Sequence, residues 1–158
     1  MSPMPEIIGI DHIYVAVSDM AVSQGFYDRV FLRVLGFRSN AFSLGGEPHI
    51  QYYNRQMGYV LRPARRPGPT DPYAPGLHHL CLRVDGIDEV RAAARALAAQ
   101  GLAATPARPY PDYAPDYWAT FLDDPDGIRL EITNYRRERR ERHDRWDDED
   151  GTGRHNRQ

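Results

Sequence analysis

The sequence has no lysine, because all twenty of its basic residues are arginine. This absence excludes chemistry that needs a lysine amine, including Schiff-base catalysis, pyridoxal-phosphate attachment and the lysine of phosphate-binding loops. Cys81 is the one cysteine in the sequence. A single thiol excludes an intramolecular disulfide framework and every zinc or redox motif that needs two cysteines, so a reducing compartment is compatible with this chain.

Long apolar runs and an excess of positive charge are also missing. No stretch approaches the run of about 18 apolar residues that a membrane span requires. The first six residues lack the basic start and apolar core of a signal peptide. The formal net charge of −2 argues against a nucleic-acid partner held by a general positive field. We therefore expect a cytoplasmic protein that binds neither membranes nor nucleic acids.

The 158 residues suffice for one domain with a sizeable core, and the composition changes near the end of the chain. Residues 136–158 contain eight arginines and seven acidic residues, with Trp146 as the only large apolar group. Such a segment cannot offset the entropy of folding by burial, so we expect a solvated, charged tail. Glu138, Arg139 and Arg142 fall at helical spacings, which favours a helix near its start.

An internal repeat organises residues 6–135. Residues 10–17 and 77–84 have the alternation of strands, and a helical pattern follows each of them. About three short strand-like stretches come after each helical pattern. A βαβββ unit therefore occurs twice in tandem.

Turn and cap residues mark the boundaries of the two units. An aspartate precedes each predicted helix and a glycine ends it: Asp19 and Gly36 in the first unit, then Asp85 and Gly101 in the second. Prolines and glycines predict a linker over residues 64–76. We predict a single α+β domain over residues 6–135, with modules at about 6–63 and 77–135. Each helix covers one face of its sheet, so the bare faces of the two modules can form a cupped mixed sheet.

Alternation along the strands assigns the histidines to faces of the sheets. In the first strand the apolar side chains at alternate positions should pack under the helix, which leaves His12 and Tyr14 on the opposite face. In the second unit His78 belongs to the apolar set, so His79 is the residue that matches His12. Glu131 lies on the polar side of the last strand by the same alternation. Three groups that can bind a metal therefore fall at matched positions of a duplicated unit.

These residues carry a family resemblance. The His-bearing first strand, the Gly-Leu-His-His-Leu sequence at 76–80 and the Asp-Asp-Pro-Asp-Gly turn at 123–127 resemble the vicinal-oxygen-chelate superfamily. That superfamily contains glyoxalase I, extradiol dioxygenases, methylmalonyl-CoA epimerase, fosfomycin-resistance enzymes and bleomycin-resistance proteins. The resemblance covers about residues 6–135, and its most specific signal is this turn before a strand with a central glutamate. It implies paired modules that form a cup around one divalent metal ion.

The resemblance places the metal ligands at His12, His79 and Glu131. Two imidazoles and one carboxylate suit Fe(II), Mn, Ni, Co or Zn, and they leave coordination positions for a substrate. The fourth metal position of the family, a glutamate in glyoxalase I, falls on Arg62. A guanidinium can neither ligate a cation nor act as a base near neutral pH. Glu47 or Gln51 would fill this position if the register of the strand differs.

Aromatic and cationic side chains supply further candidates. Tyr113 and Tyr117 lie in a loop before the seventh strand, where a phenol could donate a hydrogen bond or act as a general acid. With Glu131 they are the candidate catalytic residues. The candidates for binding a small-molecule substrate are Tyr14, Tyr53, Arg62 and Arg129, because strand alternation places the first two in the cup and arginine grips anions.

The expected function is that of a metal-dependent enzyme whose small substrate chelates the ion through two neighbouring oxygens. The reaction would be that of a lyase or isomerase, similar to lactoylglutathione lyase, or that of a dioxygenase. A protein that binds a drug or metabolite without turnover is the alternative, and thiol or water addition to a phosphonate is a third reading. We expect a homodimer, although paired modules can come from one chain or be exchanged between two.

Overall fold

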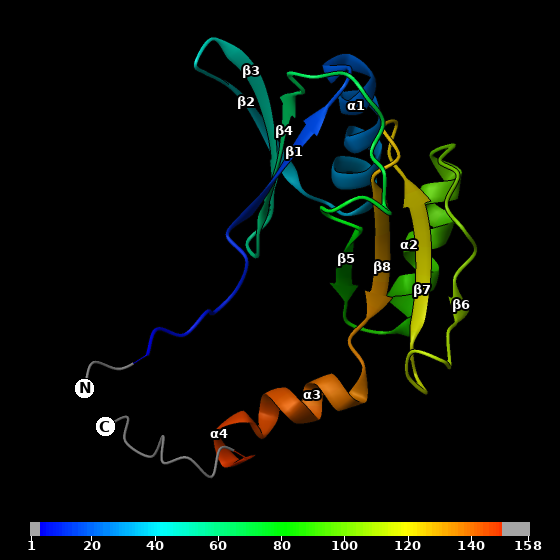
Figure 1. Ribbon diagram of the computed structural model, residues 1–158. Coiled ribbons are helices and arrows are strands. Elements are labelled where there is room, and N and C mark those ends of the chain that lie inside the picture. The colour runs from blue at the N-terminus through cyan, green and yellow to red at the C-terminus, as the bar shows by residue number, and fades with distance from the viewer. Residues whose placement is uncertain (1–3, 150–158) are drawn as a thin grey trace.

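The computed structural model describes residues 4–149 and contains two βαβββ modules, which confirms the predicted α+β fold (Figure 1). The elements of the first module are β1 (His12–Val17), α1 (Met20–Tyr27), the π-helical segment η1 (Asp28–Val34), β2 (Arg38–Leu44), β3 (Glu47–Tyr53) and β4 (Gly58–Pro63). Those of the second are β5 (His79–Val84), α2 (Ile87–Ala99), β6 (Arg108–Pro109), β7 (Trp118–Asp123) and β8 (Arg129–Asn134). Two short helices, α3 (Arg137–Asp144) and α4 (Trp146–Glu149), follow the second module.

Each module forms its own four-stranded mixed sheet. The strand orders are β1-β4-β3-β2 and β5-β8-β7-β6, so the two sheets have the same topology. The first strand of each module lies at a sheet edge and pairs in parallel with the last strand of that module. His12 and His79 are the first residues of these two edge strands. The sheets therefore present the two histidines at equivalent positions.

The helix of the first module begins and ends where the sequence predicts. The Asp19 carboxylate accepts a hydrogen bond from the Val22 N–H at 3.0 Å and caps α1. The helical path continues through η1, and Gly36 follows it with a φ of 68°. Only glycine adopts this left-handed conformation without steric cost, so Gly36 ends the helix.

The helix of the second module begins one residue later than its predicted cap. Gly86, not Asp85, is the N-cap residue of α2, and its extended backbone makes no side-chain capping bond. The prediction was wrong because the Asp85 carboxylate is instead engaged by Arg140 of α3. At the other end the prediction holds, since Gly101 has a φ of 73° just after the helix.

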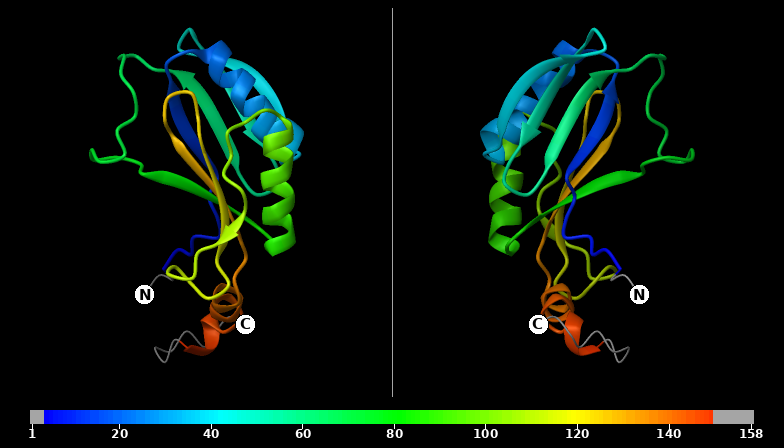
Figure 2. Two further views of the ribbon diagram at one scale, coloured as in Figure 1. Left: turned by 90° about the vertical axis from the view of Figure 1, so that its right-hand side faces the viewer. Right: turned by 90° about the vertical axis from the view of Figure 1, so that its left-hand side faces the viewer.

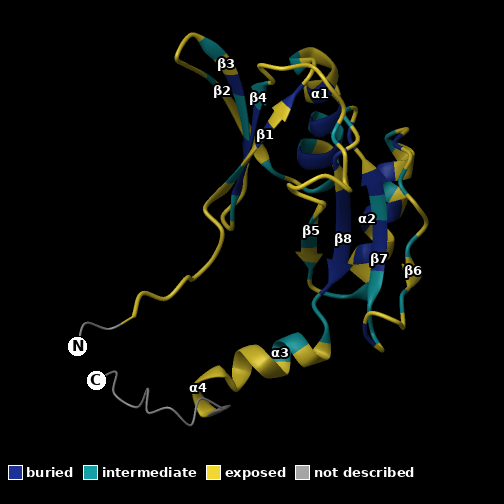
Figure 3. Cartoon of the chain, in the orientation of Figure 1, coloured by how far each residue is buried: buried dark blue, intermediate teal, exposed yellow. Residues whose placement is uncertain are grey.

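The two modules share one hydrophobic core. Figure 2 shows α1 and α2 along one side of the molecule, with the linker after β4 on the opposite side. Tyr27 and Phe31 of the first module are buried, as are Leu97 and Ile132 of the second, and all four belong to one contiguous cluster. Figure 3 shows this burial where the helices face β7 and β8, whereas the N-terminal segment and α3 are largely exposed. Burial of apolar surface between the modules therefore stabilises the whole chain.

A buried carboxylate joins the modules at the β7–β8 turn. Asp124 accepts a hydrogen bond at 2.7 Å from the Tyr27 hydroxyl, which also lies 2.8 Å from the Tyr59 hydroxyl. Its other oxygen accepts bonds from the N–H groups of Asp126 and Ile128, at 2.9 and 2.8 Å. Burial raises the pKa of Asp124 above its usual range. The turn that gave the most specific sequence signal is thus a structural joint.

The same turn also fixes the end of β1. The Asp126 carboxylate accepts a hydrogen bond from the Ser18 N–H at 2.9 Å, and its carbonyl accepts one from the Thr70 N–H in the linker. Ser18 directly follows β1, so the C-terminal end of β1 lies beside the N-terminal side of β8.

The charged segment after β8 forms α3 as its helical spacing predicts, within the residues that the structure describes. All of its side chains are exposed or partly exposed. The rest of the predicted tail, residues 150–158, lies outside the described residues. None of the helices within residues 4–149 has the length and apolar character needed to cross a membrane.

Candidate functional site

The second sheet brings together two of the three predicted metal ligands. β5 and β8 are parallel neighbours, and His79 and Glu131 lie on the same face of them. The His79 Nε2 atom lies 3.3 Å from the Glu131 Oε2 atom. Glu131 is buried at 3% exposure, whereas the His79 side chain is 40% exposed. An imidazole at the surface thus sits beside a carboxylate held within the protein.

Tyr117 positions this carboxylate. Its hydroxyl donates a hydrogen bond to the Glu131 Oε1 atom, which leaves the Oε2 atom facing His79. Burial and this hydrogen bond raise the pKa of Tyr117, so the phenol stays protonated near neutral pH and is a donor and not a base. The Arg136 guanidinium also lies over the Tyr117 ring, 4.5 Å from its centre.

Cys81 is the neighbour of Glu131 on β5. Although part of the residue is exposed, burial of its thiol and the nearby Glu131 carboxylate raise the thiol pKa to about 12. A thiol with this pKa is protonated near neutral pH, and the thiolate is the form that attacks electrophiles or binds metals. Cys81 therefore lines the site without being a nucleophile.

In each predicted histidine ligand, the Nδ1 atom contacts the side chain of the preceding residue. His79 Nδ1 lies 2.8 Å from His78 Nδ1, and His12 Nδ1 lies 2.6 Å from the Asp11 carboxylate. A partner at one ring nitrogen fixes the orientation of the ring and directs the other nitrogen to a ligand. In both histidines the Nε2 atom is the one available to bind a metal.

His12 lies on β1 of the first sheet and is not grouped with the pair on the second sheet. The contact between Ser18 and Asp126 places the far end of β1 at the module junction. His12 is the first residue of β1 and lies at the opposite end of this strand from that contact. Among residues 4–149, no group of three or more His, Cys, Asp or Glu side chains is arranged to hold a metal. One chain therefore presents two separate halves of the predicted metal site.

The strand register corrects the predicted equivalence of Arg62 and Glu131. His79 pairs with Arg129, so Glu131 lies two residues further along β8. His12 pairs with Gly58, and the residue two positions further along β4 is Val60. Val60, which has no metal-binding atom, thus occupies the position that the sequence assigned to Arg62.

Arg62 is also engaged by an acidic neighbour. Its guanidinium donates a hydrogen bond to Glu47, which also pairs with Arg65 at 3.1 Å. The Arg65 hydrogen bond and the two positive charges lower the pKa of Glu47. Arg62 and Glu47 therefore form an ion pair with each other. This pairing weakens the predicted substrate-binding role of Arg62 and the alternative of Glu47 as a metal ligand.

The remaining predicted residues lie on three parts of the surface. Tyr14 is 44% exposed, with its ring edge-on to that of His12 at 5.5 Å. Arg129 lies beside His79 in the second sheet, its guanidinium 4.4 Å from the centre of the Phe121 ring. Tyr113 is 65% exposed and contacts the Tyr117 ring at 5.2 Å. Tyr113 thus adjoins Tyr117, whose hydroxyl donates a hydrogen bond to Glu131.

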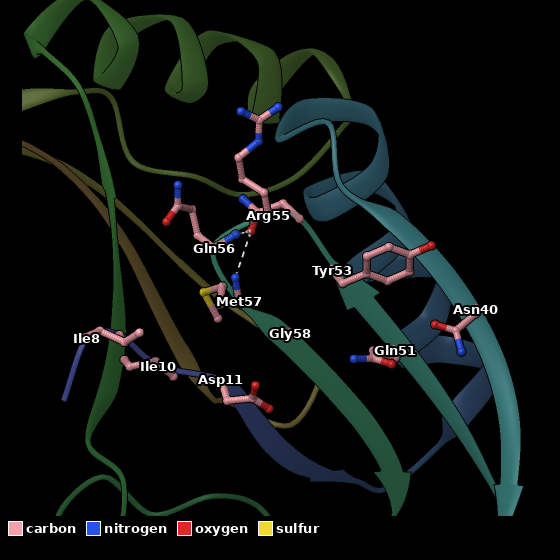
Figure 4. Close-up of a pocket in the computed structure, with 12 residues that line it drawn as sticks. Ile8, Ile10, Asp11, Asn40, Gln51, Tyr53, Arg55, Gln56, Met57 and Gly58 are labelled. Atoms are coloured by element: carbon pink, nitrogen blue, oxygen red, sulfur yellow. Dashed lines mark hydrogen bonds between the residues drawn. The ribbon is translucent and has the colours of Figure 1, made fainter. Parts of the chain in front are cut away.

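A pocket of about 650 Å³ opens at the His12 end of the first sheet (Figure 4). Its lining includes Asp11, Gln51, Tyr53 and Gly58, with apolar side chains from the segment before β1. Tyr53 thus lines a pocket on the predicted face. Nothing in the sequence indicated that Gly58 lines this pocket, because a glycine at the start of a strand resembles an ordinary turn residue.

Solved structures of other proteins share this arrangement of tandem modules. A glyoxylase/bleomycin resistance protein/dioxygenase domain from Frankia sp. EAN1pec has a TM-score of 0.68 and 23% identity, over 83% of this chain and 100% of that chain. Lactoylglutathione lyase from Agrobacterium tumefaciens has a TM-score of 0.56 and 20% identity, over 82% and 94%. The fosfomycin resistance protein FosX from Listeria monocytogenes has a TM-score of 0.59 and 17% identity, over 85% and 99%. These similarities define a paired βαβββ fold.

The sequence itself identifies the family. A comparison with curated proteins found no match. Residues 9–132 match the family profile of the Glyoxalase/Bleomycin resistance protein/Dioxygenase superfamily, and the chain belongs to this superfamily.

Proposed function

We propose that this protein is a divalent-metal-dependent enzyme in which His79 and Glu131 bind the ion together with His12 of a second copy. The proposal rests above all on the 3.3 Å contact between His79 Nε2 and Glu131 Oε2. An imidazole nitrogen and a carboxylate oxygen on neighbouring strands are a suitable ligand pair for Mn, Fe, Co, Ni or Zn. A hydrogen bond from Tyr117 holds the carboxylate in place, as partners of metal ligands commonly do.

Two observations support a homodimer with shared sites. A transition-metal site usually needs three or more protein ligands, and each chain offers only the two halves described above. Ile7 and Ile8 directly precede β1 with exposures of 86% and 97%, and Ile10 is 58% exposed. Adjacent exposed apolar residues are typical of an interaction surface. A second copy on this side of the first sheet would cover them and supply the missing half of the site.

The chain's own residues would bind and orient the substrate. A bound divalent ion would stabilise negative charge that develops on two neighbouring substrate oxygens. Arg129 lies beside His79 and forms no ion pair within the described part of the chain, so its guanidinium is free to bind an anionic group of the substrate. Tyr117, which is protonated, would keep Glu131 in its orientation.

The two candidate reactions are distinguished by metal and substrate. Iron in the protein as isolated, with turnover of catechols, would support a dioxygenase. Nickel or zinc, with turnover of hemithioacetals formed from methylglyoxal and a thiol, would support a lyase or isomerase. Both substrate types carry two neighbouring oxygens, which is why one fold could serve either reaction.

Metal content tests the ligand assignment. We expect about one divalent ion per chain in the wild type and its loss in His79→Ala, measured by elemental analysis. His143→Ala is the matched control, since His143 lies on α3, away from both sheets, and this variant should retain the ion. Equal metal content in the wild type and His79→Ala would contradict the proposal.

Mixed dimers test whether two copies share each site. His12→Ala and His79→Ala should each abolish metal binding as homodimers. A dimer that contains one chain of each variant has one site with all three ligands and one site with only Glu131. Mixing the variants should therefore restore up to half of the wild-type metal content per dimer. A site within one chain predicts no restoration.

A non-catalytic protein that binds a drug or metabolite is the second candidate. The open pocket at the His12 end of the first sheet favours it, because Ile8, Ile10 and Met57 give this pocket an apolar part that suits an organic ligand. Chelation of metal separates the two functions: loss of ligand binding or turnover supports the metal-dependent enzyme, and unchanged ligand binding supports simple sequestration.

A further inference from the structure

The part of the chain beyond the family profile contributes to the surroundings of the candidate metal site. The profile match ends at residue 132, and α3 begins at Arg137. Since β7 and β8 are antiparallel, the start of β7 lies beside the end of β8, and Figure 1 shows α3 leaving that end of β8. Tyr117 directly precedes β7. The start of α3 is therefore placed next to the tyrosine that holds Glu131.

Arg136 is the residue of this segment that contacts the Tyr117 ring. Its guanidinium lies 4.5 Å from the ring centre, and its side chain is only 11% exposed. Its ion pair with Glu138 is long, since Nε and Oε1 lie 3.7 Å apart, beyond hydrogen-bond distance. The Nε atom is buried and has no hydrogen-bond partner among residues 4–149. Burial of a cation is costly without compensation, so the electron-rich face of the phenol ring is a partner that Arg136 needs.

Hydrogen bonds fix the backbone on both sides of Tyr117. The Asp116 carboxylate accepts a hydrogen bond at 2.9 Å from the N–H of Arg137, the first residue of α3. The NH₂ group of Asn134 donates to the Asp116 carbonyl at 2.9 Å. The Asn134 Oδ1 atom accepts a hydrogen bond from the Trp118 N–H, also at 2.9 Å. The backbone of Tyr117 is thus held at the junction of β8 and α3, and the orientation of its side chain depends on what surrounds the ring.

We propose that Arg136 is a positioning residue of the metal site and acts through Tyr117. This inference rests on the proposed function. The guanidinium keeps the Tyr117 ring in the orientation from which its hydroxyl donates to Glu131. The carboxylate then keeps its other oxygen toward His79. The metal site of this chain would thus depend on a residue that lies outside the family profile.

A direct effect of the Arg136 charge on the ion would have the opposite sign. Burial raises the pKa of Cys81, and the charge of Arg136 acts in the other direction, so this charge reaches the site. A cation repels a divalent metal ion, and its removal would tighten metal binding if Arg136 acted by charge alone. Removal of a residue that orients Tyr117 would weaken metal binding. The two roles therefore differ in the direction of the effect.

The metal affinity of Arg136→Ala separates these roles. The dissociation constant for Zn²⁺ is measured on the metal-free, full-length protein by competition with a chromogenic chelator. We expect binding to weaken by more than twofold and by up to about 30-fold, which is the range that loss of a cation–π contact can produce. Arg142→Ala is the matched control and should match the wild type, since Arg142 is an exposed arginine of the same helix. Affinity of Arg136→Ala that is within twofold of the wild type, or tighter, would overturn this inference alone.

A double-mutant cycle with Tyr117→Phe shows whether the effect passes through the Tyr117 hydroxyl. The hydroxyl is absent in this background, so adding Arg136→Ala should cause less than twofold further loss of Zn²⁺ affinity. A general loss of stability would weaken metal binding in both backgrounds. A further loss of twofold or more would therefore overturn this inference. A wild-type protein that binds no divalent metal would overturn the proposed function and this inference together.

Discussion

Replacement of Asp124 should weaken the joint between the two modules. In Asp124→Ala the N–H groups of Asp126 and Ile128 lose their acceptor, whereas the Tyr27 hydroxyl can still turn to Tyr59 at 2.8 Å. A buried donor without a partner costs about 1–3 kcal/mol, so the two N–H groups together cost about 2–6 kcal/mol. For a chain of this length, at about 2–4 °C per kcal/mol, the Tm should fall by roughly 4–24 °C.

Asp124→Asn is the matched control. Its amide oxygen accepts the same two N–H bonds, and its NH₂ group can donate to the Tyr27 oxygen. We therefore expect a loss below about 1.5 kcal/mol in urea unfolding of this variant. If Asp124→Ala proves as stable as Asp124→Asn within about 1 kcal/mol, the hydrogen bonds of the turn do not hold the modules together.

The same pair of proteins gives a pH test. Burial raises the pKa of Asp124, so the folded state binds this proton more tightly than the unfolded state does. The free energy of unfolding of the wild type should then fall, relative to that of Asp124→Asn, as the pH rises from about 4 through the folded-state pKa. Thermal unfolding of both proteins between pH 4 and pH 7 measures the difference. A relative gain of the wild type with rising pH would mean that the protein stabilises the charged carboxylate.

Two further substitutions test the contacts of Tyr117 and Arg140. Tyr117→Phe removes the hydrogen bond to Glu131, so metal affinity should fall about 10–100-fold, measured on metal-free protein by competition with a chromogenic chelator. The exposed Tyr73→Phe should leave it unchanged, and equal affinity in both variants would exclude a positioning role. Arg140→Ala breaks a surface ion pair with Asp85 and should cost less than about 1 kcal/mol in urea unfolding. A much larger loss would show that α3 helps to hold the second module together.

Strand alternation was sufficient to predict which faces carry the chemistry. Because side chains alternate with a period of two, His12, His79 and Glu131 could be assigned to the polar faces from the sequence, and the structure places all three there. The internal repeat likewise predicted the two modules and their order of elements. These features are local, and sequence patterns describe local structure well.

The pairing of strands was harder to predict. A shift of two residues along β4 preserves the face of every side chain, so alternation cannot distinguish Arg62 from Val60 as the counterpart of Glu131. Only the hydrogen-bonded register of β1 with β4 decides between them. The wrong prediction of the α2 N-cap has a similar cause. Asp85 and Gly86 are both good cap residues, and the distant Arg140 engages Asp85.

The distance between the half-sites depends on packing across the whole chain. The sequence marks the apolar side of each helix but does not specify how the two modules pack against each other. The Ser18–Asp126 contact and the shared core place the far end of β1, and not His12, at the junction. For this reason the sequence alone left open whether one chain or two would complete the site.

The shared core means that the unit of duplication and the unit of folding differ. A single module would expose Tyr27 and Phe31, or Leu97 and Ile132, to water and would lose the Tyr27–Asp124 bond. Neither repeat should therefore fold alone, and the complete chain should unfold in one cooperative transition. The two half-sites of a chain are thus parts of one cooperative body, although in the proposed dimer they would belong to different metal centres.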